Sequence, residues 1–313
     1  MSNFMFSINV TIPIFLVILL GYILKKINFI TEEFVRVANK YVFIVALPVM
    51  LFQDIKNTNV SGQMNVKFFF FCLVTTIIMF FFVWGIARLF VRDKSMVGAF
   101  AQASARGSAA VLGVAFVENI CGNIGMTPLM IVAAVPFFNI LSVVILVFNS
   151  NEERQYSKIK GACINIIKNP IIIGIILGVI ASMLPIKIPV LFERTLSYVS
   201  RTATPIALIV IGAGFEVKEV MSRLMPSLFA SFIKLIGLPV IFLPIAYMMG
   251  FRDSEMVAIL IMLASPTTVS CYIMAKNMGN DEALTSNVIV LTTLLSSVTL
   301  TMWIYVLKVA GCI

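Results

Sequence analysis

Apolar runs about as long as a bilayer is thick recur along almost the whole chain, and they constrain its fold more than any other feature. A helix needs about 20 mostly apolar residues to cross a bilayer, and in lipid every backbone polar group must be paired within the protein. Ten segments meet this condition: 6–24, 38–53, 67–87, 95–117, 127–148, 169–184, 196–215, 225–249, 256–275 and 283–307. The sequence therefore predicts an all-α membrane protein with ten transmembrane helices.

The composition argues against most soluble functions. Of the 313 residues, 60% are hydrophobic and 12% are charged, whereas a soluble domain is about half apolar and about a quarter charged. Histidine is absent, which excludes imidazole acid–base catalysis and imidazole metal ligands. We therefore expect no enzyme activity, no cofactor, no metal and no nucleic-acid partner. A membrane-embedded enzyme or a signalling protein is the less favoured alternative, because no acid pair or metal cluster is available for chemistry.

The basic residues indicate an orientation. Of the 23 lysines and arginines, 14 lie in or beside one alternating set of loops and six in the other, while Arg106, Arg201 and Lys234 fall within predicted spans. Cytoplasmic loops carry the excess of basic residues. This bias predicts a plasma-membrane (inner-membrane) protein whose two termini are both extracytoplasmic.

Weak internal similarity suggests a duplication. Residues 92–97 and 252–257 agree at four of six positions, at an offset of 160. Two further matches have an offset of 157: Tyr41 and Pro48 with Tyr198 and Pro205, and Gly122-Asn123 with Gly279-Asn280. Five spans in each half would give the halves opposite orientations, as in many secondary transporters. We expect a first repeat at 1–148, a cytoplasmic connection at 149–168 and an inverted repeat at 169–313, with chance similarity as the alternative.

Two predicted spans contain helix-breaking sequence at bilayer depth. The fourth contains small, polar and charged residues at 101–108, and the ninth contains Pro266 among serines and threonines at 264–270. Proline removes a backbone donor, and irregular backbone at this depth is tolerated only inside protein or beside a wet cavity. Paired interruptions of this kind indicate a binding site, and the half-helix N-termini near Gly107 and Thr267 would attract an anion. A pair of packing kinks without a ligand is the alternative.

Charged residues at depth favour an anionic substrate. Arg106 lies inside the fourth span, where a guanidinium could bind a carboxylate or could instead pair with helix-end carbonyls. Lys234 lies deep in the eighth span and fits a functional and a structural role equally, whereas Arg201 can snorkel to the outer interface. All 14 acidic residues fall in loops or at span ends, as Asp54 does. The candidate substrate-binding residues are Ser104, Arg106, Gly107, Ser108, Lys234, Pro266, Thr267, Thr268 and Ser270, and Pro48 and Pro205 are candidate kinks.

Short motifs are spread over essentially the whole chain. They are Ile12-Pro13-Ile14-Phe15 with Gly21-Tyr22-Ile23-Leu24-Lys25-Lys26, Asn39 with Ala46-Leu47-Pro48 and Phe52, Thr204-Pro205-Ile206-Ala207 with Ile211-Gly212-Ala213, and Ser265-Pro266 with Ala275-Lys276-Asn277-Met278-Gly279. Together they resemble the first, second, seventh and ninth spans of the auxin efflux carrier family of membrane transporters, in its compact bacterial branch. The fourth span of that family often has an asparagine, a glycine five residues after it and a proline two residues after the glycine. This chain has Ser108, Gly113 and Ala115 at these positions, so it lacks the asparagine and the proline.

The resemblance implies a fold and a function. It implies ten helices in two inverted five-helix repeats, with a scaffold from helices 1, 2, 6 and 7 and a transport unit from helices 3–5 and 8–10. It further implies export or exchange of organic anions, which are auxin in plants and dicarboxylates such as malate or malonate in bacteria, by a homodimer. We expect elevator-type alternating access for a small carboxylate, with possible H⁺ or Na⁺ coupling. A Na⁺-coupled symporter of the bile-acid type is the alternative.

Overall fold

The computed structural model describes most of the chain as helices. The described residues are 13, 16–56, 65–109, 117, 120–121, 125–150, 167–183, 188–214 and 221–313. Their helices are α2 (Glu32–Tyr41), α3 (Leu47–Lys56), α4 (Val66–Phe90), α5 (Lys94–Ala105), α7 (Thr127–Phe148), α9 (Pro170–Met183), α10 (Val190–Ala213), α12 (Leu224–Phe232), α13 (Leu238–Met248), α14 (Asp253–Ala264), α15 (Ser270–Asn277) and α16 (Glu282–Val309), with two π-helical segments, η1 (Val42–Ala46) and η2 (Ile233–Gly237). Within these ranges no β-strand is present, so the all-α prediction is confirmed for the described part of the chain.

Among the described residues, six helical stretches are long and apolar enough to cross a membrane: Glu32–Lys56, Val66–Phe90, Thr127–Phe148, Val190–Ala213, Leu224–Met248 and Glu282–Val309. A shorter apolar helix lies at Pro170–Ser182. Residues 6–12, 14 and 15 of the predicted span 6–24, residues 110–116 of the predicted span 95–117 and residues 151–166 of the predicted connection lie outside the described residues. The helix predicted at 38–53 is longer than expected, because it begins at Glu32 and ends at Lys56.

Each π-helical segment comes immediately before a Leu-Pro pair. The Leu47 N–H donates to the Val42 carbonyl, five residues back, and the Leu238 N–H donates to Ile233 in the same way. A proline cannot donate to the helix ladder and crowds the preceding turn, and one widened turn lets the helix continue past it. Pro48 thus follows a local widening, whereas α10 continues through Pro205.

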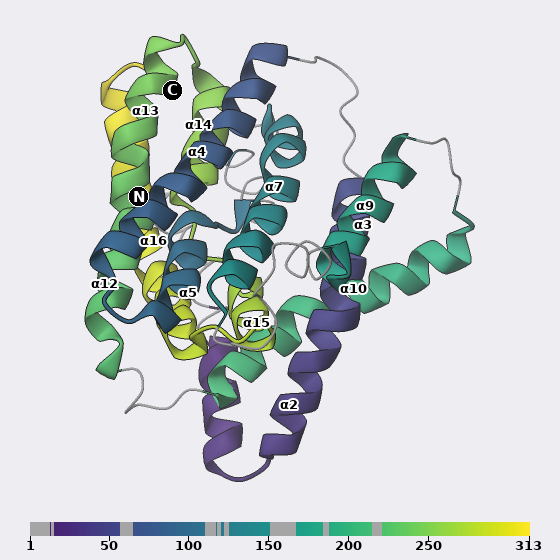
Figure 1. Ribbon diagram of the computed structural model, residues 1–313. Helices are drawn as coiled ribbons and strands as arrows, with labels where there is room; N and C mark the ends of the chain where they lie inside the picture. Colours follow the sequence, from purple (N-terminus) through teal and green to yellow (C-terminus); the bar gives the residue numbers. More distant parts are fainter. Residues whose placement is uncertain are drawn as a thin grey trace.

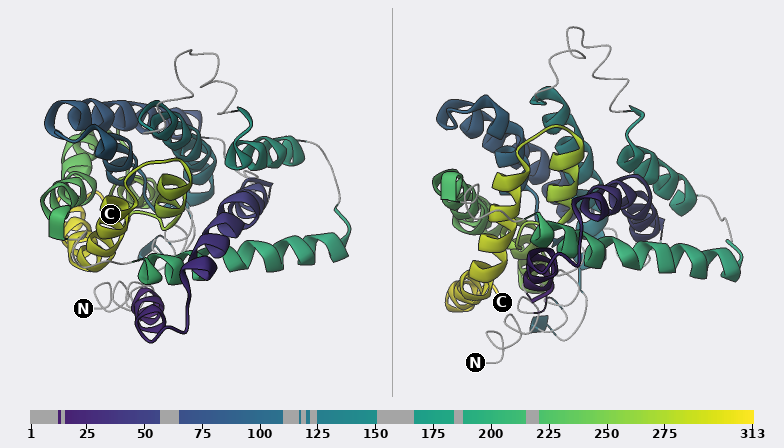
Figure 2. Two further views of the ribbon diagram at one scale, coloured as in Figure 1. Left: turned by 60° about the horizontal axis from the view of Figure 1, so that its bottom comes forward. Right: turned by 90° about the horizontal axis from the view of Figure 1, so that it is seen from below.

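Buried side chains form two hydrophobic clusters, and the ribbon shows the corresponding two groups of helices (Figures 1 and 2). The first cluster joins α4, α5, α12, α13, α14, α16 and most of α7. The second joins α2, η1, α3, α9 and α10 with the C-terminal end of α7 and with α15. In both views of Figure 2 the N-terminal half of α10 extends away from the remaining helices. Residues 105–108 and 264–268, which begin at the last residues of α5 and α14, lie between these two clusters.

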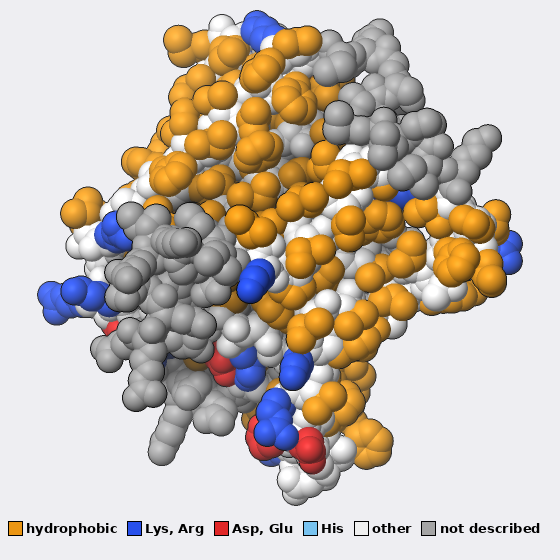
Figure 3. Space-filling model, turned by 45° about the vertical axis from the view of Figure 1, so that its right-hand side comes forward, with side chains coloured by type: hydrophobic (Ala, Val, Ile, Leu, Met, Phe, Trp, Pro, Cys, Tyr) orange, Lys and Arg blue, Asp and Glu red, His pale blue; other side chains and the backbone are white. Residues whose placement is uncertain are grey.

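The outer surface is strongly apolar. Large hydrophobic side chains are exposed along α4, α9, α10 and α13, and examples are Phe70, Leu177, Leu191 and Met248. In Figure 3 orange side chains cover a broad central area, and most of the red and blue side chains lie toward its lower part and its margins. A soluble monomer rarely exposes so large a continuous apolar surface. This arrangement fits a multi-pass membrane protein.

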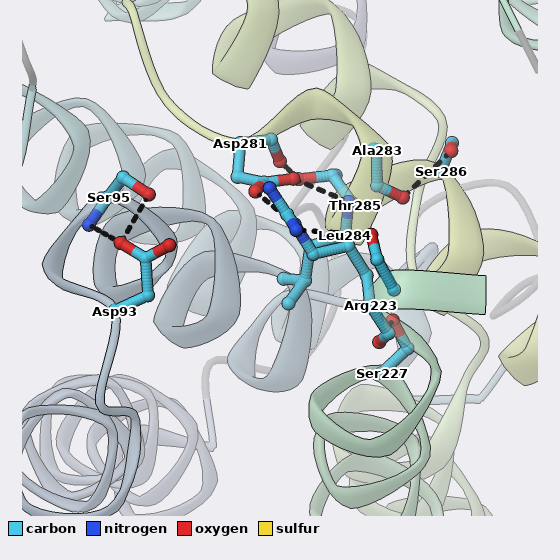
Figure 4. Close-up of polar contacts among 10 residues, drawn as sticks. Asp93, Ser95, Arg223, Ser227, Asp281, Ala283, Leu284, Thr285 and Ser286 are labelled. Carbon is cyan, nitrogen blue, oxygen red and sulfur yellow. Dashed lines mark hydrogen bonds and ion pairs between the residues drawn. The ribbon is translucent and has the colours of Figure 1, made fainter. Parts of the chain in front are cut away.

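Charged residues hold helix ends together at one end of the first cluster (Figure 4). The Asp93 carboxylate accepts from the Ser95 N–H at 3.0 Å and caps α5. The Asp281 carboxylate accepts from the Leu284 N–H at 2.7 Å, caps α16, and also pairs with Arg223 Nε at 2.7 Å. Because Arg223 comes just before α12, this ion pair ties the start of α12 to the start of α16.

Candidate functional site

Two helices end inside the protein, and the segments that follow them pair with each other. α5 ends at Ala105 and α14 ends at Ala264. The chain then continues in extended conformation through Arg106 and Ser265, and an antiparallel bridge joins Gly107 to Thr267. The Ser108 N–H donates to the Pro266 carbonyl at 2.9 Å. We call residues 105–108 and 264–268 the crossing segments. They lie within the two interruptions that the sequence predicts.

Local chemistry explains why the helices stop here. Pro266 has no N–H for the helix ladder and disfavours helical backbone at Ser265, which has a φ of −63° and a ψ of 149°. Gly107 allows the segments to approach, because a Cβ at this position would clash with Ser265 Oγ and would lie 2.9 Å from Lys234 Nζ. The two interruptions therefore depend on one proline and one glycine.

Side chains from other helices fix the crossing segments. The Thr267 N–H donates to Thr292 Oγ1 of α16 at 3.0 Å, and Thr267 Oγ1 donates to the Ala103 carbonyl of α5 at 2.8 Å. Lys234, fully buried in η2, donates from Nζ to the Ala105 carbonyl at 3.0 Å. A cation at the C-terminal end of a helix is favourable. These contacts satisfy backbone groups that the broken helices leave unpaired.

Arg106 is 5% exposed, and its guanidinium has neutral partners. Nη2 donates to Asn139 Oδ1 of α7 at 2.6 Å, and Nη1 contacts Met274 Sδ of α15 at 2.8 Å. None of the ion pairs found among the described residues includes Arg106. A buried guanidinium of this kind favours the approach of an anion, because neither of these two partners carries a negative charge.

Two small cavities adjoin the crossing segments. The first, about 80 Å³, is lined by Leu47, Met50, Ser108, Ala203, Thr204, Ala207, Leu208, Pro266, Thr267, Thr268, Val269, Ser270 and Thr293. The second, about 40 Å³ and called the Arg106 cavity below, is lined by Met50, Leu51, Asp54, Arg106, Gly107, Ser108, Ala109, Val135, Phe138, Asn139, Thr268 and Ser270. Ser108, Thr268 and Ser270 line both, so the two cavities lie side by side. Their polar lining could hold water or the oxygen atoms of a small solute.

The start of α15 also lies at these cavities. α15 begins at Ser270, whose side chain is within 3.3 Å of Thr268 Oγ1. The Cys271 and Tyr272 N–H groups of this first turn donate to the Thr268 and Val269 carbonyls, and the positive end of the helix dipole favours an anion here. The corresponding half-helix after Gly107 falls mostly outside the described residues.

The structure brings most of the predicted residues together. Arg106, Gly107, Ser108, Pro266, Thr267, Thr268 and Ser270 line the two cavities. Ser104 and Lys234 line neither. Ser104 donates to the Phe100 carbonyl of its own helix at 2.7 Å, and Lys234 binds the end of α5.

Two polar residues of the Arg106 cavity, Asn139 and Asp54, were not among the candidates. Asn139 is a buried amide in the middle of the apolar segment 127–148, and this isolated polar residue could have indicated it. Asp54 lies at the end of the membrane-spanning stretch Glu32–Lys56, as expected, but it also lines the cavity. α3 continues to Lys56, so Asp54 lies in its last turn.

The chain is similar to known proteins that are described as membrane transporters. The model of a family described as "Membrane transport protein" matches residues 6–304. The chain is 23% identical to the "Putative malonate transporter" of Rhizobium meliloti, over 96% of this chain and 95% of the relative. It is also 23% identical to an "Uncharacterized transporter" of Methanothermobacter thermautotrophicus, over 97% and 99%, and to the "Uncharacterized transporter YfdV" of Escherichia coli K12, over 98% and 99%.

Proposed function

Because the chain belongs to the membrane transport protein family, the family of the auxin efflux carriers, we propose that it is a secondary transporter for a small carboxylate-bearing anion. It exports or exchanges this anion across the plasma membrane. A dicarboxylate of the size of malonate is the first substrate to test, since one relative of similar length carries that name. The protein itself catalyses no chemical reaction.

The observation that carries this proposal is the environment of Arg106. Its guanidinium is buried where two interrupted helices cross, lines a cavity with hydroxyl groups, and donates to the neutral side chain of Asn139. A guanidinium can bind a carboxylate through two parallel hydrogen bonds. The hydroxyl groups of Ser108, Thr268 and Ser270 are placed to donate hydrogen bonds to the remaining oxygen atoms of the anion. Lys234 has a positioning role, because it holds the end of α5 beside Arg106.

The mechanism we propose is elevator-type alternating access. The first hydrophobic cluster, which contains α4, α5, α12–α14 and α16, corresponds to the mobile transport unit, and the second, which contains α2, α3, α9 and α10, to the scaffold. The bridge between Gly107 and Thr267 pairs residues 160 apart, which supports two inverted five-helix repeats. In this proposal both termini are extracytoplasmic, the scaffold forms a homodimer, and the anion moves with the crossing segments.

A Na⁺ ion bound between the crossing segments is disfavoured by the charges nearby. Arg106 and Lys234 are both buried there. Lys234 Nζ donates to the Ala105 carbonyl oxygen, an atom that could otherwise bind a cation. The positive charge of Arg106 opposes a cation nearby. The Na⁺-coupled alternative therefore predicts stabilisation by Na⁺, and the present proposal predicts none.

The test is malonate binding by the purified full chain, measured by calorimetry in detergent. We expect R106Q to weaken binding by at least about 30-fold, since loss of one partner from a buried charged hydrogen-bonded pair costs about 2–5 kcal/mol. R201Q is the matched control, because Arg201 is exposed on α10. Binding by R106Q with the affinity of the wild type, in protein that unfolds at the wild-type temperature, would refute the site.

A further inference from the structure

Asp54 is a second charged residue at the Arg106 cavity. It lies on α3, one turn after Met50, and both residues line the cavity together with Arg106. Leu51 and Ile55, on either side of it in sequence, are buried in the second hydrophobic cluster, whereas α5, which leads into Arg106, belongs to the first. Asp54 and Arg106 thus line the same cavity from two separately packed groups of helices.

The other charged groups of neighbouring helices are engaged elsewhere or exposed. On α3 itself, Lys56 pairs with Glu193 of α10 at 2.7 Å. Arg194 and Arg201 of α10 are exposed, and α7 and α9 contain no ionisable side chain. Lys276 of α15 pairs with Glu282 at 2.7 Å, and Lys234 binds the Ala105 carbonyl. Among the described residues that line the Arg106 cavity, only Arg106 and Asp54 carry a formal charge.

An anion in this cavity would change the protonation of Asp54. With the cavity empty, Arg106 and Asp54 are the two residues of opposite formal charge that line it. A substrate carboxylate on Arg106 places a second negative charge in a space of about 40 Å³. Two carboxylates that share a site cannot both stay ionised at low cost, so one of them takes up a proton.

We propose that Asp54 is the proton-binding residue of this site, and that each carboxylate anion bound at Arg106 is accompanied by one proton on the Asp54 carboxyl group. The inference rests on the proposed function. The proton comes from water on the side where the anion binds, attaches to a carboxylate oxygen of Asp54, and leaves to water when the anion is released. No bond of the anion is made or broken. Anion and proton therefore move in the same direction.

The absence of histidine makes proton uptake on malonate binding easier to measure. The chain has no histidine, so no imidazole contributes to a pH dependence close to neutrality. Linkage requires that an anion that binds with uptake of one proton loses affinity as the pH rises, by at most about tenfold for each pH unit. The same linkage predicts that malonate binding takes up one proton from a weakly buffered solution.

The experiment measures malonate affinity and proton uptake from about pH 6.5 to about pH 8.5, where an ordinary carboxylate in water stays ionised. We expect the wild-type Kd to rise with pH, D54N to bind malonate with a nearly constant Kd, and E193Q to keep the wild-type slope. E193Q is the matched control, because Glu193 is a nearby carboxylate that does not line the cavity. Proton uptake by the wild type, read with an indicator dye, gives an answer even where D54N folds poorly.

Three results would overturn the inference while the proposed function stands. They are a wild-type Kd that does not change with pH, an unchanged slope in D54N, and an equal loss of slope in E193Q. Failure of the proposed function looks different, because malonate and related carboxylates would then not bind the wild type at any pH, or R106Q would bind them as the wild type does. Dimethyl malonate, which has no charge, is expected to bind neither the wild type nor D54N.

Discussion

Gly107→Ala tests whether the close approach of the crossing segments is what builds the site. A Cβ at position 107 would clash with Ser265 Oγ and would lie 2.9 Å from Lys234 Nζ. Ser265 is fully buried, and its neighbour Pro266 accepts the Ser108 N–H at 2.9 Å, so the clash cannot be relieved by a simple side-chain rotation into open space. We therefore expect the extra methyl group to push the two segments apart.

The magnitude follows from what overpacking costs in a well-packed interior. One added carbon that forces backbone shifts destabilises a protein by about 1–3 kcal/mol. The matched control is Gly85→Ala in α4, where a Cβ meets no atom within 4 Å. At that position alanine is expected to stabilise the helix by about 0.5–1 kcal/mol, because it has the higher helix propensity.

The assay is equilibrium unfolding of both purified variants in mixed detergent micelles, together with calorimetric malonate binding. We expect G107A to lose stability and to bind malonate more weakly, because Arg106 and Ser108 flank the substituted residue. We expect G85A to keep the wild-type affinity. G107A that matches G85A in both stability and affinity would refute the reasoning. The crossing segments would then accommodate a Cβ atom at position 107 without moving apart.

Two further predictions concern the helix ends shown in Figure 4. Asp281→Ala should lower the free energy of unfolding by about 1–3 kcal/mol, since it removes a helix cap and an ion pair with Arg223; Asp281→Asn, which keeps a capping oxygen, should fall between Ala and the wild type, and equal losses in the two variants would contradict this. At Asp93, hydrogen bonds from the Ser95 hydroxyl and then from its N–H lower the pKa of the carboxyl group. The folded pKa lies below the unfolded value, so this contribution to stability is present above the unfolded pKa and is lost as the pH falls through the folded pKa. Ser95→Ala should raise the Asp93 pKa toward its ordinary value in an NMR titration, and an unchanged pKa would show that the hydroxyl contributes nothing.

The interruptions of the helices could be predicted because they depend on local chemistry. Pro266 and Gly107 disfavour helix whatever surrounds them, and α14 and α5 end within three residues of them. The long helices were predictable for a similar reason, since about 20 apolar residues are long enough to cross a bilayer. The segment predicted at 127–148 coincides with α7, Thr127–Phe148.

The partners of the crossing segments could not be predicted in the same way. Asn139 and Thr292 contact Arg106 and Thr267 from helices far away in sequence. In a segment that is apolar on all sides, the pattern does not say which face turns inward. The place of Asp54 at the end of a span could be predicted, but its position at the same cavity as Arg106 depends on how α3 packs beside the crossing segments.

Lys234 illustrates a limit of reasoning from charge alone. The sequence indicates that a lysine at this depth needs a partner, and both a substrate carboxylate and a protein group satisfy that need. The structure supplies the Ala105 carbonyl at 3.0 Å. Which helix end the ammonium reaches depends on how η2 packs against α5, and this packing is a tertiary property.

Exchange of labelled malonate by the full chain in proteoliposomes tests the central claim most directly. With malonate inside the vesicles, the account predicts that the wild type and R201Q accumulate external labelled malonate, and that R106Q, reconstituted to the same amount, does not. Exchange by R106Q at the wild-type rate would contradict the account, because the anion would then cross the membrane without the buried guanidinium on which the proposed site depends.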